Sequence, residues 1–174
     1  DHDWNWSREC DDALKTVKEK VTKTPVLAFF DPNEELVLQV DSSQSGLGAA
    51  IMQKGRPIEY ASRALTKAEQ RWAQIEKETL ALVFGLERFD QYTYGRAVRV
   101  QNDHKPLATI LKKPLSQASR RIQALMMRLY RYDIRFEYVR GTQLFIADTL
   151  SRAYLPDPGD DVCVLAVNSL IDIA

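Results

Sequence analysis

Residues 36–53 read Leu-Val-Leu-Gln-Val-Asp-Ser-Ser-Gln-Ser-Gly-Leu-Gly-Ala-Ala-Ile-Met-Gln, and this stretch decides the fold. The apolar, β-branched run at 36–40 predicts a strand buried on both faces, and the run at 47–52 predicts a second strand. The polar residues between them have the composition of a tight turn. The first strand ends on Asp41, where a buried charge needs a partner. Two interpretations of Asp41 stay open at this point: a turn residue that caps its own backbone, or a metal ligand.

The composition sets the class of protein. The chain has 174 residues, 45% of them hydrophobic, and a net charge of zero, which fits one domain or one domain with an appended piece. No apolar run approaches the ~18 residues of a membrane span, and the N-terminal Asp-His-Asp-Trp-Asn-Trp is not a signal peptide. Only two cysteines and two histidines are present, which argues against a disulfide framework and a zinc site. Because residue 1 is not Met, we expect a piece of a longer protein.

Hydrophobic periodicity predicts the remaining elements. Strands are expected at 56–62, 97–101 and 134–139, and helices at 7–22, from Thr66 to about Phe89, at 106–111, 117–131 and 143–152. Thr66 and Glu69 have capping-box spacing. In the helix at 117–131 we expect Ile122, Leu125, Met126, Leu129 and Tyr130 to face the core. The three early strands are joined by short connections and should be antiparallel, whereas a strand that follows a long helix should pair in parallel.

Acidic side chains recur at the ends and edges of these elements. If the strand at 97–101 lies beside the first strand, Asp103 and Asp41 are neighbours at one edge of the sheet, where α/β folds place their sites. Glu76 and Glu78 lie on opposite edges of the apolar stripe of the long helix, so periodicity does not tell which of them faces a site.

Positive charge is concentrated between residues 112 and 140. Eight lysines and arginines in this block face only Asp133 and Glu137, whereas the tail after Arg152 has four aspartates and no lysine or arginine. Two interpretations compete, a solvated helix surface and a face that binds phosphates.

Six motifs occur together in family order: Thr24-Pro25-Val26-Leu27-Ala28-Phe29, Val40-Asp41-Ser42-Ser43 with Gly46-Leu47-Gly48-Ala49, Tyr60-Ala61-Ser62-Arg63, Glu76-Lys77-Glu78-Thr79-Leu80-Ala81-Leu82, Asp103-His104-Lys105-Pro106-Leu107, and Ala147-Asp148-Thr149-Leu150-Ser151-Arg152. On these motifs the chain resembles the ribonuclease H domain of reverse transcriptases from gypsy-type LTR retrotransposons, from about Trp6 to Pro156. The resemblance implies an α/β, ribonuclease H-like fold. Such a fold has a five-stranded mixed sheet, with three antiparallel strands and further parallel strands, and helices flank the sheet.

The resemblance also implies the activity and the site. Asp41, Glu78, Asp103 and Asp148 match the family's four metal-binding acids, which selects Glu78 over Glu76. Two Mg²⁺ ions, or Mn²⁺ in their place, serve hydrolysis of the RNA strand of an RNA–DNA hybrid, a reaction that needs an activated water and a neutralised leaving oxygen. The residues expected to contact nucleic acid are those of the turn and of the basic block: Ser42, Ser43, Gln44, Gly46, Arg120, Arg121 and Arg140.

The same resemblance implies a domain organisation and partners. Residues 1–30 would be the end of the polymerase connection, 31–155 the ribonuclease H domain, and 156–174 a linker towards the next polyprotein domain. The partners would be the hybrid and the polymerase and integrase portions of the polyprotein, with no membrane, in a cytoplasmic virus-like particle.

Two departures from the family pattern bear on activity. No His lies between Tyr138 and Ala147, where many ribonucleases H have one, so we expect activity with slower product release. Asn102 stands where the family more often has Thr or Ser, and we expect a modest effect. The alternative function is a catalytically silent ribonuclease H-like module that binds nucleic acid or connects domains.

Overall fold

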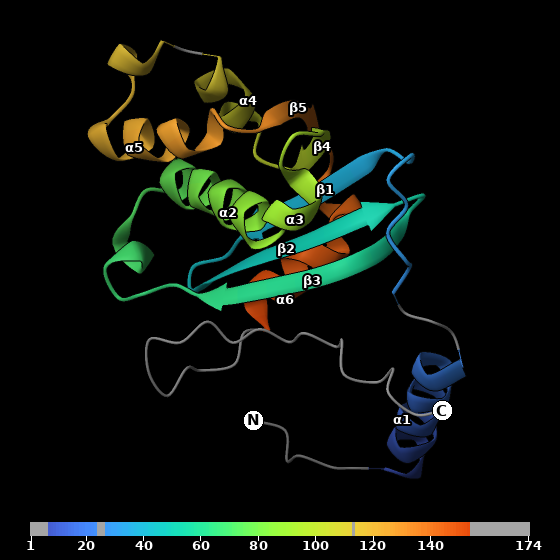
Figure 1. The fold of residues 1–174 in the computed structure, drawn as a ribbon. Helices are drawn as coiled ribbons and strands as arrows, with labels where there is room; N and C mark the ends of the chain where they lie inside the picture. Colours follow the sequence, from blue (N-terminus) through green and yellow to red (C-terminus); the bar gives the residue numbers. More distant parts are fainter. Residues whose placement is uncertain (1–6, 24–26, 113, 154–174) are drawn as a thin grey trace.

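A single mixed sheet forms the centre of the molecule in the computed structural model, which describes residues 7–23, 27–112 and 114–153. Its strands are β1 (Leu36–Ser42), β2 (Gly46–Gln53), β3 (Arg56–Ala64), β4 (Ala97–Asn102) and β5 (Asp133–Tyr138), in the order β3-β2-β1-β4-β5 (Figure 1). The first three pair antiparallel, β4 runs parallel to β1, and β5 runs parallel to β4. The predicted five-stranded mixed sheet is therefore confirmed, including the placement of β4 beside β1.

The described helices are α1 (Arg8–Lys23), α2 (Gln74–Arg88), α3 (Asp90–Thr93), α4 (Lys105–Leu111), α5 (Arg120–Leu129) and α6 (Phe145–Arg152), with short 3₁₀ turns η1 (Glu69–Arg71), η2 (Leu115–Gln117) and η3 (Gly141–Gln143). Of these, α2 and α6 pack directly on the sheet, and α5 packs on α2. None of the described helices is long and apolar enough to cross a membrane.

Two glycines allow helices to pack closely on opposite faces of the sheet. A Cβ atom at Gly85 of α2 would meet side chains of Val40 and Ala49, at 2.9 and 3.3 Å. A Cβ atom at Gly48 of β2 would lie 2.2 Å from the carbonyl oxygen of Ala147 in α6. Because neighbouring residues of a strand point to opposite faces, Gly48 and Ala49 place α6 on one face and α2 on the other, as Figure 1 shows.

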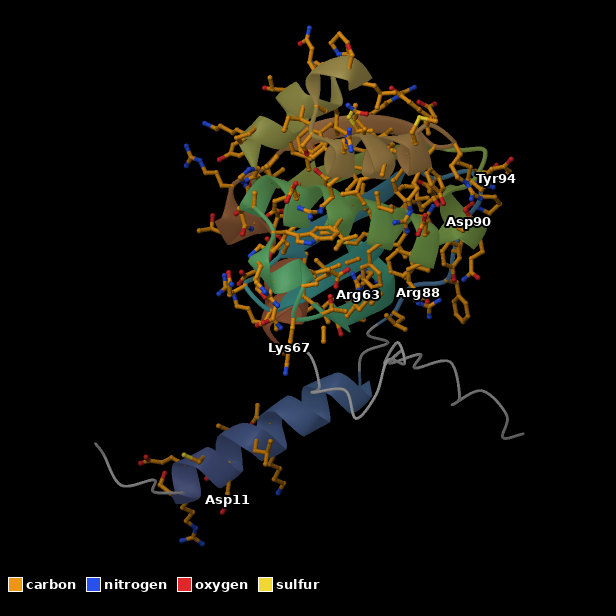
Figure 2. All side chains as sticks on the ribbon, turned by 90° about the vertical axis from the view of Figure 1, so that its left-hand side faces the viewer. Asp11, Arg63, Lys67, Arg88, Asp90 and Tyr94 are labelled. Atoms are coloured by element: carbon orange, nitrogen blue, oxygen red, sulfur yellow. The ribbon has the colours of Figure 1, made fainter. Side chains whose placement is uncertain are left out.

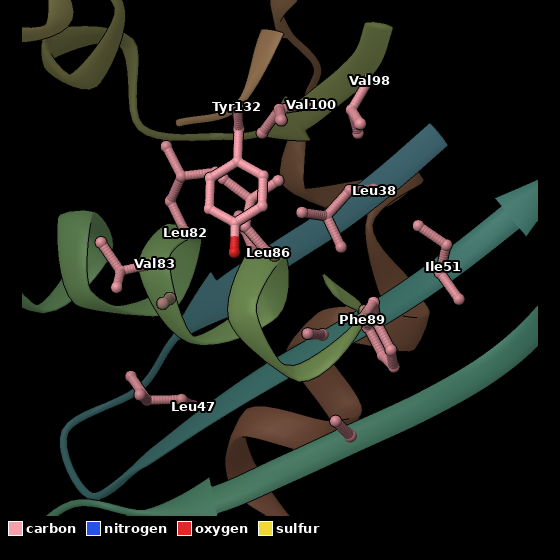
Figure 3. Close-up of a cluster of buried hydrophobic side chains, with 14 of the residues drawn as sticks. Leu38, Leu47, Ile51, Leu82, Val83, Leu86, Phe89, Val98, Val100 and Tyr132 are labelled. Carbon is pink, nitrogen blue, oxygen red and sulfur yellow. The ribbon is translucent and has the colours of Figure 1, made fainter. Parts of the chain in front are cut away.

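The hydrophobic core fills the space between the sheet and α2 (Figure 3). The strands contribute Leu38, Val40, Leu47, Ile51, Val98 and Val100, and α2 with the residue after it contributes Leu82, Leu86 and Phe89, all buried. This agrees with the predicted two-sided burial of β1 and with the apolar stripe of the long helix.

The predicted start of the long helix was wrong. The Thr66–Glu69 capping pair does form, since the Thr66 N–H donates to Glu69 Oε2 at 2.9 Å and the Glu69 N–H donates to Thr66 Oγ1 at 3.2 Å. It caps only the η1 turn, however, because Trp72 and Ala73 adopt extended backbone with ψ of 155° and 149°. The helix begins again at Gln74.

The helix predicted at 117–131 is also shorter than expected. Ser119 caps its first turn, accepting a hydrogen bond from the Ile122 N–H, so α5 begins at Arg120. The prediction that Tyr130 faces the core was wrong, because its side chain is 63% exposed at the C-terminal end of α5. The predicted linker at 156–174 and the first six residues of the predicted polymerase connection lie outside the described residues.

Candidate active site

Asp41, at the C-terminal end of β1, is buried and held by the last helix. Its side chain is 7% exposed, and Oδ2 accepts a hydrogen bond from the Ser151 hydroxyl of α6 at 2.7 Å. Burial raises the pKa of Asp41, the Ser151 hydrogen bond opposes that shift, and the negative charges of Asp103 and Asp148 raise the pKa further. Three of the four predicted acids therefore interact electrostatically.

Glu78 of α2 is buried more deeply and held by amides on both oxygens. It is 2% exposed, Gln74 Nε2 donates to Oε1 at 2.7 Å, and Asn102 Nδ2 donates to Oε2 at 2.9 Å. Burial raises its pKa to about 7 although these donors favour the charged form, and the charge of Asp41 adds to the rise. A carboxylate with such a pKa, at the edge of a sheet, is a functional-site candidate on physical grounds.

Glu76, the alternative that periodicity left open, points away from these acids. Its Oε2 accepts from Arg121 Nη1 of α5 at 2.7 Å and from the Ala73 N–H at 3.2 Å. The structure thus places Glu78 among the acids and uses Glu76 to tie α2 to α5.

Asp103 and Asp148 are the more accessible acids. Asp103 follows β4, and its Oδ2 lies 2.7 Å from where a Cβ of Gly141 would sit, so the chain after β5 passes directly beside it. Asp148 of α6 accepts from Arg152 Nε at 2.7 Å within the same helix. Both acids meet solvent, whereas Asp41 and Glu78 form the buried side of the site.

This donor set fits Mg²⁺ or Mn²⁺ in its chemistry. All four candidate ligands are carboxylates, the hard oxygen donors that these ions prefer. Burial first, and then the charge of neighbouring carboxylates, raises the pKa of Asp41 and of Glu78. In the part of the chain that the structure describes, no three His, Cys, Asp or Glu side chains converge into a ready-made metal cage.

The turn between β1 and β2 is fastened to both neighbouring helices. The Ser43 hydroxyl donates to the Ser151 carbonyl at 2.7 Å and accepts from the Gly46 N–H at 2.9 Å. Gln44 Oε1 accepts from the buried Lys77 ammonium of α2 at 2.9 Å. Of the residues expected here to meet nucleic acid, Gln44 is exposed and Ser43 half-buried, whereas Ser42 and Gly46 are buried.

The basic block is partly neutralised. Arg121 pairs with Glu76 and lies over the Trp72 ring at 4.3 Å, and Arg128 pairs with Glu87. Arg131 pairs with Asp90 at 3.0 Å and lies over Tyr94 at 5.3 Å, at the corner where Figure 2 labels Asp90 and Tyr94. Arg120 and Arg140 are exposed and have no acidic partner among the described residues. The sequence could not predict these pairings because the partners lie 41 to 45 residues apart.

Sequence reasoning missed residues that hold the acids and the turn at Gln44. Ser151, Gln74 and Lys77 are polar residues on helices, and such residues are usually solvent-exposed. One signal was present for Ser151, since it follows Asp148 by three positions and so lies on the same helix face.

Comparisons with known proteins identify the family and the fold of this chain. Residues 6–100 match the family model of the RNase H-like domain found in reverse transcriptase, a range that includes Asp41 and Glu78 but ends before Asp103 and Asp148. The chain is 34% identical to the Retrovirus-related Pol polyprotein from transposon 297 of Drosophila melanogaster over 81% of its own length and 13% of that polyprotein. It is also 34% identical to the Pol polyprotein from transposon gypsy of the same organism, over 75% of its own length and 12% of the polyprotein.

Solved structures share the fold. The protease-reverse transcriptase of Prototype Foamy Virus superposes with a TM-score of 0.59 and 23% identity, covering 78% of this chain and 19% of that one. LC11-RNase H1, solved in complex with an RNA/DNA hybrid, superposes with a TM-score of 0.53 and 14% sequence identity, covering 67% of this chain and 93% of that one. Since the family model covers more than half of the sequence, the chain belongs to the RNase H-like domains of reverse transcriptases, with Pol polyproteins of transposons as its relatives.

Proposed function

We propose that this chain is a metal-dependent endonuclease that hydrolyses the RNA strand of RNA–DNA hybrids, as the ribonuclease H portion of a transposon Pol polyprotein. One observation supports it most: Asp41 and Glu78 are both buried and both have a raised pKa. The charge of Asp41 contributes to the raised pKa of Glu78, and the charges of Asp103 and Asp148 contribute to that of Asp41. Uncompensated negative charge of this kind is costly to a fold unless cations bind to it.

The four acids would hold two Mg²⁺ ions, or Mn²⁺, which supply an activated water and neutralise the leaving oxygen of the phosphodiester. The chain's own part is to orient the ligands. Gln74 and Asn102 fix both oxygens of Glu78, and Ser151 fixes Oδ2 of Asp41. Carboxylates held in this way need little rearrangement when the substrate arrives.

The turn at 43–46 and the free arginines would contact the hybrid. Gln44 presents its side chain from a turn that is tied to α2 and α6, and Arg120 and Arg140 are free to bind phosphates. The buried Ser42 would act through the loop backbone and through Gln74, whose Nε2 donates a hydrogen bond to Ser42 Oγ at 3.0 Å. Arg121 would act at the phosphates only by exchanging its pairing with Glu76.

The remaining assignments follow from the relatives. The chain spans about 13% of the length of the Pol polyproteins that it matches, so residues 1–30 would lead from a polymerase portion and 156–174 towards an integrase portion. The particle in which such a polyprotein is packaged would be the site of action.

A cleavage assay on three duplexes tests the activity. Labelled RNA–DNA hybrid, double-stranded RNA and double-stranded DNA are incubated with the protein in Mg²⁺ or in chelator. We expect cleavage of the RNA of the hybrid only, in Mg²⁺ only, and its loss in Asp41→Asn and Glu78→Gln. Glu76→Gln is the matched control, because Glu76 lies two residues from Glu78 but faces Arg121.

The alternative functions give different results in the same assay. Binding of the hybrid without any cleavage in Mg²⁺ or Mn²⁺ would indicate a catalytically silent module. Cleavage of double-stranded DNA would contradict hybrid specificity, and equal loss of activity in Glu76→Gln and Glu78→Gln would contradict the assigned site.

A further inference from the structure

We propose that four exposed residues next to Asp103 form a binding surface for the sugar–phosphate backbone of the hybrid. They are Lys105, Tyr138, Arg140 and Phe145, and we call them the β5–α6 surface. This inference rests on the proposed function and adds a specific place at which the substrate is held beside the acids.

The fold brings these residues to the site from three elements. Tyr138 at the end of β5 is the register partner of Asn102 at the end of β4, and the Val139 N–H donates to the Asn102 carbonyl at 3.1 Å. The chain then passes Asp103 at Gly141, where an added Cβ would lie 2.7 Å from Oδ2 of the acid. The β5–α6 surface is therefore adjacent to Asp103.

Phe145 extends this surface towards Asp148. It is the first residue of α6 and precedes Asp148 by three positions, so the two side chains occupy the same face of the helix. Phe145 is 67% exposed, although burying a phenylalanine side chain gains about 2 kcal/mol. The packing of the domain thus leaves unused an aromatic ring one turn from a candidate ligand.

The two cations of the surface are available to a ligand. Lys105 Nζ lies over the Tyr138 ring, 4.8 Å from its centroid, and neither Lys105 nor Arg140 has an acidic partner in the described part of the chain. This differs from Arg121, Arg128 and Arg131, each of which pairs with an acid on α2 or α3. Two free cations beside an acidic site offset its repulsion of phosphates.

The chemistry of the surface fits a hybrid in particular. Bases inside a duplex are stacked and unavailable, but the wide, shallow minor groove of an A-like duplex exposes riboses and their 2′-hydroxyls. The Phe145 ring can pack on the apolar face of a sugar, and the Tyr138 hydroxyl can hydrogen-bond a 2′-hydroxyl. Lys105 and Arg140 would bind the phosphates on either side.

Binding measurements on paired variants test this inference. Fluorescence anisotropy of a labelled RNA–DNA hybrid is followed in Mg²⁺ on the Asp41→Asn background, where the substrate is not consumed. We expect Phe145→Ser to raise Kd roughly fivefold, because the apolar contact between the ring and the sugar is lost. We expect Arg140→Ala to raise Kd and to reduce the slope of log Kd against log salt by about 1.

Two variants at the opposite end of the sheet serve as matched controls. Phe29 is 89% exposed and sits with Lys54 near the β2–β3 turn, away from the strand ends that carry the acids. Phe29→Ser and Lys54→Ala remove the same kinds of side chain and should leave Kd and the salt slope unchanged. If Phe145→Ser lowers the melting temperature, the Phe145→Leu variant tests the surface instead. It keeps an apolar side chain but removes the ring, so it should also raise Kd.

The outcomes separate this inference from the proposed function. Loss of affinity in the Phe145 and Arg140 variants, with the controls unchanged, supports the surface even if the wild-type chain cleaves no hybrid. Wild-type cleavage with unchanged Kd and KM in both variants overturns the surface and leaves the activity standing.

Discussion

Glu78 is the residue at which stability and function conflict most directly. It is 2% exposed, and its pKa of about 7 means that ionising it at neutral pH works against the fold. The amides of Gln74 and Asn102 reduce that cost but do not remove it. A buried carboxylate with a strongly raised pKa is a candidate for a functional role rather than a packing role.

The raised pKa predicts how stability depends on pH. The pKa of Glu78 is near 4.5 in the unfolded chain and about 7 in the folded chain, so between these pH values the folded chain binds more protons. The contribution of Glu78 to the free energy of unfolding is therefore fully present below about pH 4.5 and is lost as pH rises through about 7. In chelator, the free energy of unfolding should decrease by about 3 kcal/mol over that range. Asp41, whose pKa is also raised, acts with the same sign.

Urea unfolding at several pH values measures this effect. Glu78→Gln should remove most of the slope because the group no longer titrates, whereas Glu76→Gln should retain it. If the wild-type chain in chelator instead became more stable as pH rises from about 5 to about 7, the raised pKa of Glu78 would be contradicted.

Gly141 leaves room for the carboxylate of Asp103. A methyl group there would lie 2.7 Å from Oδ2, and because that oxygen ends a rotatable side chain, Gly141→Ala should change the free energy of unfolding by less than about 1 kcal/mol. The displaced carboxylate should lower kcat roughly 10- to 100-fold. Steady-state cleavage and thermal melts measure both quantities, with Thr142→Ala on the same loop as the control. Unchanged kcat would show that the position of the Asp103 carboxylate does not depend on the space left by Gly141.

The sequence could predict which acids form the site only in part. Asp41 and Asp103 were found because each follows a strand, and the register of a parallel pair brings such positions together. Periodicity could not choose between Glu76 and Glu78, because both are at the edge of the stripe and the choice depends on where α5 and β4 pack. The resemblance to a family made that choice, and the positions of Arg121 and Asn102 now give its physical reason.

At the level of elements, α6 depends on one glycine of β2. A Cβ at Gly48 would meet backbone atoms, the Ala147 oxygen at 2.2 Å and the Ser151 nitrogen at 2.6 Å, and a backbone cannot rotate away. Gly48→Ala should therefore push α6 from the sheet, costing roughly 3 kcal/mol and breaking the Ser151–Asp41 hydrogen bond. Urea unfolding and hybrid cleavage should both show the loss.

Gly85→Ala is the control for this prediction. Its added Cβ would meet side-chain atoms of Val40, Ala49 and Leu38, of which the closest is at 2.9 Å, on the face away from α6. It should affect stability without a specific loss of cleavage in the fraction that remains folded. A Gly48→Ala protein with wild-type stability and activity would show that α6 does not need this close approach.

Neighbouring arginines of α5 should behave differently. Arg121 pairs with Glu76 and lies over Trp72, so Arg121→Ala should cost about 1 kcal/mol of stability with little change in the salt dependence of binding. Arg120 has no such partner among the described residues, so Arg120→Ala should keep stability and reduce the salt slope by about 1. Chemical unfolding and salt titrations of hybrid binding compare the two variants. The reverse pattern would overturn this division of the basic block.

Element boundaries show what local patterns leave undetermined. The Thr66–Glu69 pair was a correct prediction of a helical turn but not of a continuous helix, because Glu69 is also bound bidentately by Arg63 of β3 at 2.8 and 3.1 Å. That contact anchors the turn to the edge of the sheet, and the chain becomes extended before α2 begins. Contacts between residues on different elements are invisible to periodicity.

At the scale of the molecule, metal binding should be linked to folding. The acids come from β1, α2, the end of β4 and α6, and the folded state alone gathers them. Mg²⁺ about 100-fold above its dissociation constant should stabilise the wild type by roughly 3 kcal/mol. Thermal melts in Mg²⁺, Mn²⁺ and chelator measure this shift. Asp41→Asn with Asp103→Asn should abolish it and Glu76→Gln should not; an equal shift in all three proteins would indicate a non-specific salt effect.

Ser151 lies 110 residues after Asp41, and its hydroxyl and carbonyl hold both that acid and the turn at Ser43. A growing chain that has been synthesised only as far as β5 contains all five strands of the sheet but lacks α6 and its contacts. The helix that completes the site is the last described element of the domain. The proposed cleavage activity would therefore arise only after α6 has been made, and removal of the chain from Phe145 onwards should abolish it.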